Sequence, residues 1–451
     1  MDIQEILAVL LQFGEIDLVR RITGVLGRTA DKPKEFAIVA MSYMNLGDYT
    51  EAIAFCEKAI SGDDDEIKMN LPSRLYPAFK GVGDYPMALS IIESVIQFSN
   101  SVEAKIEKSS CLYEANKKSD ALEVLESIDR EKLNDQQKVK FDAAMGPHQL
   151  RSGRFQEGLK NVIMTQDMAR QLQFGHQYHN AQELPLQFWK GTPDCKKLIV
   201  YLEAGIGDEF INLRFLKNLA EMGIDARLYN VFYEDPIKNK RRGLIEFYEK
   251  NGCKFIKHFD VEEYKDFQWT YSQYLPILLS VREKDLWRGP YIQAKQKRLK
   301  GKFKIGLRWS GNPVPKFRNF PLALVYNTLK DLDVTFYSLQ KDVCMEELKE
   351  FPEIVDLSKK IPSLSDVADY INSMDLLITC PTVTCTIAGA LDKECIVMTP
   401  CSDYYVFNTS NNKTPWFSNK MTLLRQKSAR IWDDVMPDLR KLVEKKVNGG
   451  C

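Results

Sequence analysis

Four short polar clusters in the second half of the chain contain residue types suited to a negatively charged, activated ligand. Each cluster follows a short apolar run, as loops at strand ends do. In chain order the clusters are Glu203-Ala-Gly-Ile-Gly-Asp208, Gly306-Leu-Arg-Trp-Ser-Gly-Asn-Pro313, Tyr337-Ser-Leu-Gln-Lys341 and Thr379-Cys-Pro-Thr-Val-Thr-Cys-Thr-Ile-Ala-Gly-Ala390. Backbone N–H groups, hydroxyls and cations at strand ends favour phosphate oxygens.

The first cluster contains a carboxylate with two interpretations. Gly205 and Gly207 would let the backbone approach a ligand closely, and the N-terminus of the following helix favours negative charge. Asp208 could cap that helix, a contribution of ~1 kcal/mol. It could equally act as a general base, which is worth ~10²–10⁴ in rate. The spacing leaves both interpretations open.

The other three clusters supply the donors that a diphosphate would need. A fork-shaped guanidinium suits phosphate oxygens, and a helix that begins with hydroxyl side chains offers its N-terminus to an anion. Gly389 would allow this helix to pack closely. The candidate phosphate-binding residues are Ser310, Asn312, Arg318, Gln340, Lys341, Thr382, Thr384 and Thr386.

Alternating strands and helices must position these clusters. Apolar runs at 197–202, 226–231, 303–309, 334–339, 375–379 and 394–398 alternate with amphipathic stretches such as 210–222, 243–250 and 364–374. This alternation predicts parallel sheets covered by helices on both faces. We expect two Rossmann-like halves, 166–300 and 301–451, with a cleft at the carboxyl ends of their strands.

A helical repeat precedes these halves. Asn45-Leu-Gly-Asp-Tyr-Thr-Glu-Ala-Ile53 is echoed by Gly81-Val-Gly-Asp-Tyr-Pro-Met-Ala-Leu89, and a small or apolar residue recurs at Val19, Ala52, Ala88, Ala121 and Gly158. The spacing straddles the ~34-residue tetratricopeptide period. The pattern predicts an α solenoid of four or five helical hairpins over 1–165. Its concave face would bind a protein or another large partner, or serve only as a scaffold.

Composition excludes several classes of protein. The 451 residues carry 62 Lys+Arg and 62 Asp+Glu, a balance that argues against a chain devoted to nucleic acid. No basic n-region opens the sequence, and no apolar run is long enough to cross a membrane. The ten cysteines form no CxxC pair, and the histidines are distant from them. We therefore expect a cytoplasmic protein without a metal site or cofactor.

One basic run leaves open a function in nucleic-acid binding or modification. Lys295-Gln-Lys-Arg-Leu-Lys-Gly-Lys-Phe-Lys304 lies where the two halves join. It could hold a polyanion such as a nucleic acid, but such runs are more often solvated helix ends and linkers.

Taken together, the clusters resemble a known family. The motifs at Leu202–Asp208, Ile305–Pro313, Ser338–Lys341 and Ala388–Leu391, together with Arg318-Asn-Phe-Pro-Leu322 and Thr414-Pro-Trp-Phe417, are similar to those of the heptosyltransferase-like glycosyltransferases, glycosyltransferase family 9. The motifs occur in the family's order, and the branch that carries tetratricopeptide repeats is the most similar.

The resemblance implies a GT-B-type pair of Rossmann domains and an inverting, metal-independent transfer of sugar from a nucleotide-diphosphate donor. Asp208 matches the carboxylate proposed to deprotonate the acceptor hydroxyl, and Arg318 and Lys341 are expected on the leaving diphosphate. The helical repeats would recruit the acceptor or a partner, and a homo-oligomer is compatible with this class.

One departure from the family favours an alternative. The family usually has Asp-Thr-x-x-x-His-Leu-Ala-Gly-Ala in the last loop, whereas this chain has Pro381 and Thr386 at the Asp and His positions. The alternative is a catalytically degenerate transferase fold that acts as a repeat-based binding or assembly protein.

Overall fold

The computed structural model describes residues 3–165, 168, 184–231, 242–311, 318–341, 343–402 and 404–449. The chain divides into two compact units, 1–137 and 138–451. This division falls within one helix and does not coincide with the domain boundary expected at 165. In the described residues no helix is both long and apolar enough to span a membrane.

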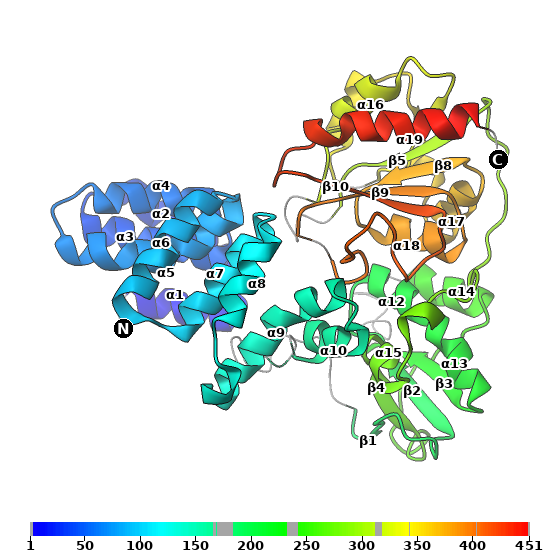
Figure 1. Cartoon of the computed structure of the whole chain (residues 1–451), viewed down its shortest axis with the longest axis horizontal. Helices are drawn as coiled ribbons and strands as arrows, with labels where there is room; N and C mark the ends of the chain where they lie inside the picture. Colours follow the sequence, from blue (N-terminus) through cyan, green and yellow to red (C-terminus); the bar gives the residue numbers. More distant parts are fainter. Residues whose placement is uncertain are drawn as a thin grey trace. The chain divides into compact units, whose positions relative to one another are not determined.

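The first unit consists of helices that pair in sequence order (Figure 1). They are α1 (Ile3–Gln12), α2 (Ile16–Thr29), α3 (Pro33–Leu46), α4 (Tyr49–Ile60), α5 (Asp65–Val82), α6 (Tyr85–Ser99), α7 (Val102–Glu114) and α8 (Lys118–Glu126), followed by the start of α9 (Asp135–Arg151). The predicted helical N-terminal region is confirmed.

The repeated residues explain why the helices pair. Gly47 ends α3 at φ 75° and Gly83 ends α5 at φ 81°, a left-handed conformation that suits glycine at a helix end. The small residues Ala52 and Ala88 are fully buried. A Cβ on Gly81 would lie 2.2 Å from the ring of Tyr49, so the missing side chain lets that ring lie directly on α5.

The last helical hairpin belongs to the second unit. It comprises the later part of α9 and α10 (Phe155–Lys160), which the short helix η2 (Asn161–Thr165) continues. Arg151 donates to the Thr409 carbonyl at 2.7 Å, and the Asn408 amide donates to the Pro147 carbonyl at 2.9 Å. The Phe155 ring packs 6.3 Å from that of Trp416. The hairpin is therefore fastened to the loop that precedes the last strand.

The first sheet has four parallel strands in the order β1-β4-β2-β3. They are β1 (Gln187–Phe188), β2 (Lys197–Tyr201), β3 (Asp225–Tyr229) and β4 (Gln268–Tyr271). Its helical segments are α12 (Ile206–Asn212), η4 (Leu213–Phe215), α13 (Leu216–Glu221), α14 (Arg242–Lys250), η6 (Ser272–Tyr274), α15 (Leu275–Leu278) and η7 (Glu283–Asp285). The predicted strands near 197–202 and 226–231 are confirmed, and Phe255 adds an isolated parallel bridge to Leu228 of β3.

The second sheet has six parallel strands in the order β10-β9-β8-β5-β6-β7. They are β5 (Lys304–Arg308), β6 (Thr335–Ser338), β7 (Val355–Asp356), β8 (Leu376–Thr379), β9 (Cys395–Thr399) and β10 (Met421–Arg425). The helical segments are α16 (Leu322–Leu329), η8 (Met345–Glu350), η9 (Ser358–Lys360), α17 (Leu364–Asn372), α18 (Val383–Ala390), η10 (Asp433–Val435) and α19 (Met436–Asn448). Helices α16 and α19 cover one face, and α17 and α18 cover the other (Figure 1).

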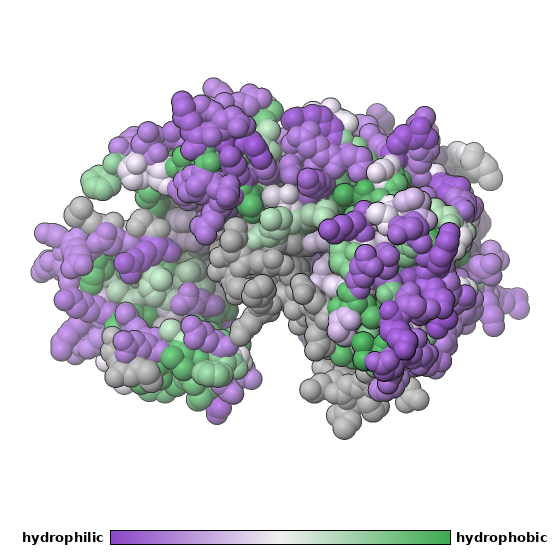
Figure 2. All heavy atoms as spheres, turned by 90° about the horizontal axis from the view of Figure 1, so that it is seen from below, coloured by the Kyte–Doolittle hydropathy of each residue, from purple (hydrophilic) through white to green (hydrophobic). Residues whose placement is uncertain are grey.

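The two sheets share a core through the helices between them. Helix α12 packs on α18, and α14 packs on α17. A single cluster of buried apolar side chains includes Phe210 of α12, Phe247 of α14 and Ile387 of α18. A second cluster lies between the second sheet and α16 and α19. The face in Figure 2 is mostly hydrophilic, and apolar residues appear there in separate groups.

A buried cation also ties the two sheets together. Arg214 of η4 donates to the carbonyl of Ile211 at 2.8 Å, to the hydroxyl of Tyr291 at 3.0 Å and to the carbonyl of Trp416. Its guanidinium also lies over the rings of Tyr291, Trp416 and Phe417. Carbonyl acceptors and aromatic faces compensate for part of the cost of burying this charge.

The basic run is a connecting segment that lies along α17. Its residues 295–300 form neither helix nor strand. The Lys295 N–H donates to Asp369 at 2.7 Å, the Lys297 ammonium lies 3.2 Å from the same carboxylate, and the Lys300 N–H donates to the Tyr337 hydroxyl at 3.0 Å. These contacts favour the linker interpretation of the run over a polyanion site.

Candidate active site

Asp208 lies in the first turn of α12, directly after β2. Gly205 is the N-cap residue of this helix, and the Asp208 N–H donates to the Gly205 carbonyl at 2.9 Å. A Cβ on Gly205 would lie 3.3 Å from Oδ2 of Asp208. The backbone N–H groups of Gly205 and Asp208 lower the pKa of this carboxyl and so favour its charged form. A position in the first turn of the helix is compatible with both interpretations of Asp208.

A second bond reaches Asp208 from the other sheet. The Tyr404 hydroxyl, in the loop between β9 and β10, donates to Oδ1 of Asp208. Burial raises the pKa of Asp208 to about 6, although the Tyr404 hydrogen bond and the backbone N–H groups lower it. Such a carboxylate changes charge near neutral pH, which is the range a general base requires.

Helix α18 brings its N-terminus close to Gly207, the residue before Asp208. A Cβ on Gly207 would lie 3.7 Å from Cα of Val383 and 3.9 Å from Oγ1 of Thr386. A Cβ at position 207 would thus make only ordinary contacts with α18, and the predicted close approach of this glycine to a ligand stays a prediction. Asp208 and the first turn of α18 lie together at the junction of the two sheets.

Arg318 joins the second and fourth clusters. Its Nη1 donates to the Pro381 carbonyl at 3.2 Å. A Cβ on Gly311 would lie 2.7 Å from Cγ2 of Thr382 and 3.1 Å from Nη2 of Arg318, so a side chain there would displace both neighbours. Burial lowers the pKa of Arg318, but an arginine remains charged. The structure thus places a half-buried guanidinium beside the start of α18.

Ser310 and Gln340 form a buried bridge. The Gln340 amide accepts from the Ser310 N–H at 3.2 Å, donates to the Ser310 carbonyl at 3.1 Å and donates to the Val343 carbonyl at 2.7 Å. Gln340 is fully buried and Ser310 is 1% exposed. These contacts hold the loops after β5 and β6 together. Gln340 therefore positions these two loops, whereas the sequence predicts that it contacts the phosphate directly.

Lys341 turns toward the opposite edge of the second sheet. Its Nζ lies 2.8 Å from the Pro362 carbonyl, in the segment that follows β7. Arg318 instead bonds Pro381, which follows β8, and the strand order places β8 and β7 on either side of β5 and β6. Lys341 and Arg318 therefore do not converge in this structure. Asn312 lies outside the described residues.

The threonines mark the start of α18. Thr382 is the N-cap residue and lies 3.5 Å, oxygen to oxygen, from Thr379, while Thr386 donates to the Val383 carbonyl at 2.8 Å. Thr384 is buried. Gly389 allows close packing, as predicted, because a Cβ there would lie 2.2 Å from the Phe417 ring.

Three residues at the junction were missed by the sequence analysis. Tyr404 and Tyr405 follow β9, a fifth strand end that carries polar side chains and that could have been found by the same reasoning. Glu203, at the end of β2, accepts from the Ser272 N–H and hydroxyl and the Gln273 N–H, each at 3.0 Å. Burial raises the pKa of Glu203 to about 7, although these hydrogen bonds lower it.

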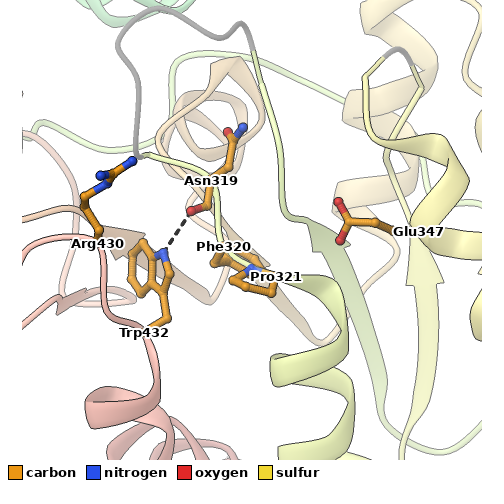
Figure 3. A pocket seen from close by; sticks show the side chains of 6 residues that line it. All are labelled: Asn319, Phe320, Pro321, Glu347, Arg430 and Trp432. Carbon is orange, nitrogen blue, oxygen red and sulfur yellow. Dashed lines mark hydrogen bonds between the residues drawn. The ribbon is translucent and has the colours of Figure 1, made fainter. Parts of the chain in front are cut away.

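A cavity of about 460 Å³ lies between the segments that follow β5, β6 and β10 of the second sheet (Figure 3). Its lining residues are Asn319, Phe320, Pro321, Glu347, Arg430 and Trp432. The indole N–H of Trp432 donates to the Asn319 carbonyl at 2.8 Å (Figure 3). The motif that begins at Arg318 therefore contributes to two places, because Arg318 bonds Pro381 while the next three residues line this cavity.

In the part of the chain that the structure describes, no group of three or more His, Cys, Asp or Glu side chains is arranged to hold a metal ion. The cysteines Cys380 and Cys385 beside Arg318 are buried thiols, and burial raises the pKa of each to about 12.

Comparison with solved structures finds glycosyltransferases. The glycosyltransferase TibC from enterotoxigenic Escherichia coli aligns with 13% identity over 59% of this chain and 76% of its own, at a TM-score of 0.37. A glycosyltransferase family 9 protein from Veillonella parvula aligns with 13% identity over 55% of this chain and 88% of its own, at 0.35. An O-GlcNAc transferase from Thermobaculum terrenum aligns with 11% identity over 81% of this chain and 82% of its own, at 0.31.

These proteins belong to the class that the sequence motifs resemble. No protein-family model and no curated protein matches the sequence. Because the identities and TM-scores are low, we draw function from the residues of this chain and not from these neighbours.

Proposed function

We propose that the chain is a glycosyltransferase that moves a sugar from a nucleotide-diphosphate donor to an acceptor hydroxyl. The observation that carries the proposal is the position of Asp208. A carboxylate with a pKa near 6 lies in the first turn of α12 and close to the N-terminus of α18, where two parallel sheets meet. The two sheets would correspond to the acceptor and donor halves of a GT-B-type fold.

In the proposed reaction Asp208 is the general base. It accepts the proton of the acceptor hydroxyl while that oxygen forms a bond to the anomeric carbon. The bond from this carbon to the diphosphate oxygen breaks on the opposite side, so the configuration inverts. The nucleoside diphosphate leaves with the bonding electron pair, and no metal ion is required by this scheme.

Arg318 and the first turn of α18 would hold the leaving diphosphate. The guanidinium already lies beside Thr382 and Gly311, and the N-terminus of α18 carries the partial positive charge of its helix. Preorganised positive charge of this kind stabilises the charge that develops on a leaving group. Ser310 and Gln340 would position the loop that carries Arg318, and Lys341 would have to turn from Pro362 to take part.

The helical hairpins would recruit a large acceptor or a partner. The last hairpin is fixed to the loop between β9 and β10, in which Tyr404 lies, through Arg151 and Asn408. An acceptor held by this last hairpin would thus be tied to the loop that contacts Asp208.

The experiment is a transfer and hydrolysis assay with a panel of nucleotide sugars, comparing wild type with Asp208→Asn. We expect the variant to keep nucleoside-diphosphate binding and to lose about 10²–10⁴ in rate. Equal rates would remove Asp208 from the mechanism. The control is Lys330→Gln on the surface after α16, which should match wild type.

The replaced last loop favours a second candidate, a catalytically degenerate transferase fold that acts as a repeat-based binding or assembly protein. The Pro381 carbonyl and the Thr386 hydroxyl are both engaged within the protein, by Arg318 and by Val383. This candidate predicts that no nucleotide sugar raises the melting temperature. A bound nucleotide at 100 times its Kd would add about 2.7 kcal/mol of stability and would count against it.

A further inference from the structure

We propose that Tyr404 is a positioning residue, contributed by the second sheet, that completes the catalytic base of the first sheet. The proposal rests on the assignment of Asp208 as the base and adds the residue that orients it. The hydroxyl of Tyr404 donates to Oδ1 of Asp208, and the two residues are 196 positions apart in sequence.

The bond selects which carboxylate oxygen can act on a substrate. Oδ1 is engaged by Tyr404, whereas Oδ2 lies on the side of Gly205, a position without a side chain. A side chain at Gly205 would come within 3.3 Å of Oδ2, so the glycine keeps side-chain atoms away from that oxygen, while the backbone N–H groups of Gly205 and Asp208 act on the same carboxylate. The acceptor hydroxyl would then meet Oδ2, and Tyr404 would hold the carboxylate in that orientation.

The ring of Tyr404 packs on a neighbouring aromatic ring and remains partly exposed to solvent. Its ring centroid is 4.5 Å from that of Tyr405, and Tyr405 packs 5.4 Å from Trp416. Trp416 in turn accepts from the buried Arg214. Tyr404 is still 40% exposed, so the pair lies at the surface of the junction where a substrate can arrive.

The hydrogen bond also acts on the charge of the base. A donor on a carboxylate favours its ionised form, which is the form that accepts a proton. Among the described ionisable groups, Tyr405 acts on Tyr404, and Glu203 and Arg214 act on Tyr405. Glu203 titrates in the same range, but its oxygens are bonded to Ser272 and Gln273 and not to Tyr404. Its contribution should be common to every variant at position 404.

The first arm of the test is the pH profile of kcat/KM for wild type and Tyr404→Phe. We expect the acidic limb, near pH 6 in wild type, to move up by about one pH unit, because the carboxylate loses a donor. KM for the donor should stay within about twofold. The matched control is Tyr291→Phe, which removes a hydroxyl bonded to Arg214 at the same junction and should leave the limb in place. An unchanged limb in Tyr404→Phe would overturn the proposal.

The second arm does not depend on activity. Melting temperatures are measured for Tyr404→Phe and Tyr291→Phe, each alone and with Asp208→Ala. Tyr404→Phe should lower the melting temperature only while Asp208 is present, whereas the effect of Tyr291→Phe should be the same in both backgrounds. Additive effects at 404 and 208 would overturn the proposal. If wild type shows no sugar transfer but the effects at 404 and 208 are not additive, the proposed function is rejected. The structural coupling of Tyr404 to Asp208 then still holds.

Intact mass after incubation with nucleotide sugars completes the test. A sugar attached to Tyr404 would make this tyrosine the acceptor and would overturn its role as a positioning residue.

Discussion

The Phe417 ring lies directly on Gly389 of α18. A Cβ at this glycine would be 2.2 Å from the ring, so the close contact depends on its absence. Because the first turn of α18 lies beside Gly207 of α12, this contact helps to hold α18 in its place next to α12.

Gly389→Ala should therefore destabilise the second unit. Overpacking of a buried contact typically costs about 1–3 kcal/mol, and a lower melting temperature is expected. Phe417→Leu should recover part of the loss in the double variant. A stabilised Gly389→Ala chain would show that α18 does not pack on this ring.

The pKa of Asp208 predicts a pH dependence of stability. The folded state holds this proton more tightly than the unfolded chain, since the pKa rises from 3.8 to about 6. The resulting stabilisation is complete below about pH 4 and is lost as the pH rises through 6. The melting temperature of Asp208→Asn minus that of wild type should thus increase between pH 4 and pH 7. A constant difference over this range would contradict the raised pKa.

Arg318 and Lys341 should differ in their effects on donor binding. Arg318 lies beside Thr382 and the start of α18, whereas Lys341 reaches Pro362. Loss of a charged hydrogen-bonding group costs about 1.5–3 kcal/mol, so Arg318→Ala should weaken nucleoside-diphosphate binding by about 10–100-fold. Lys341→Ala should change it by less than about threefold. Kd values for nucleoside diphosphate, measured by calorimetry, test this difference. Equal losses of affinity in the two variants would mean that Lys341 turns toward the donor.

Two glycines of the helical unit should respond in opposite directions. A Cβ at Gly81 would lie 2.2 Å from the Tyr49 ring, whereas one at Gly24, within α2, would meet only an arginine side-chain atom at 4.0 Å. Gly81→Ala should destabilise the unit by about 1–3 kcal/mol. Gly24→Ala should stabilise it by about 0.5–1 kcal/mol, because alanine loses less backbone freedom on folding. Denaturant unfolding of the full chain measures both, and equal effects would exclude the Tyr49 contact.

Much of the candidate site could be predicted because its signals are local. The run at 197–202 and the following glycines place Asp208 in the first turn of a helix, and they do so through neighbouring residues alone. The same holds for the threonines at the start of α18. Strands β1, β4 and β7 have short or irregular apolar patterns, and the sequence analysis predicted neither these three nor β10.

The sequence alone determined the helical hairpins, the alternation of strands and helices, and the position of Asp208 at the start of the helix after β2, because turn glycines and apolar periodicity act over a few residues. Tertiary structure decided which side chains meet. Tyr404 reaches Asp208 across 196 residues, Gln340 is buried in a loop bridge, and Lys341 turns away from Arg318. These directions depend on how the two sheets pack on the helices between them, and no local pattern of residues carries that information.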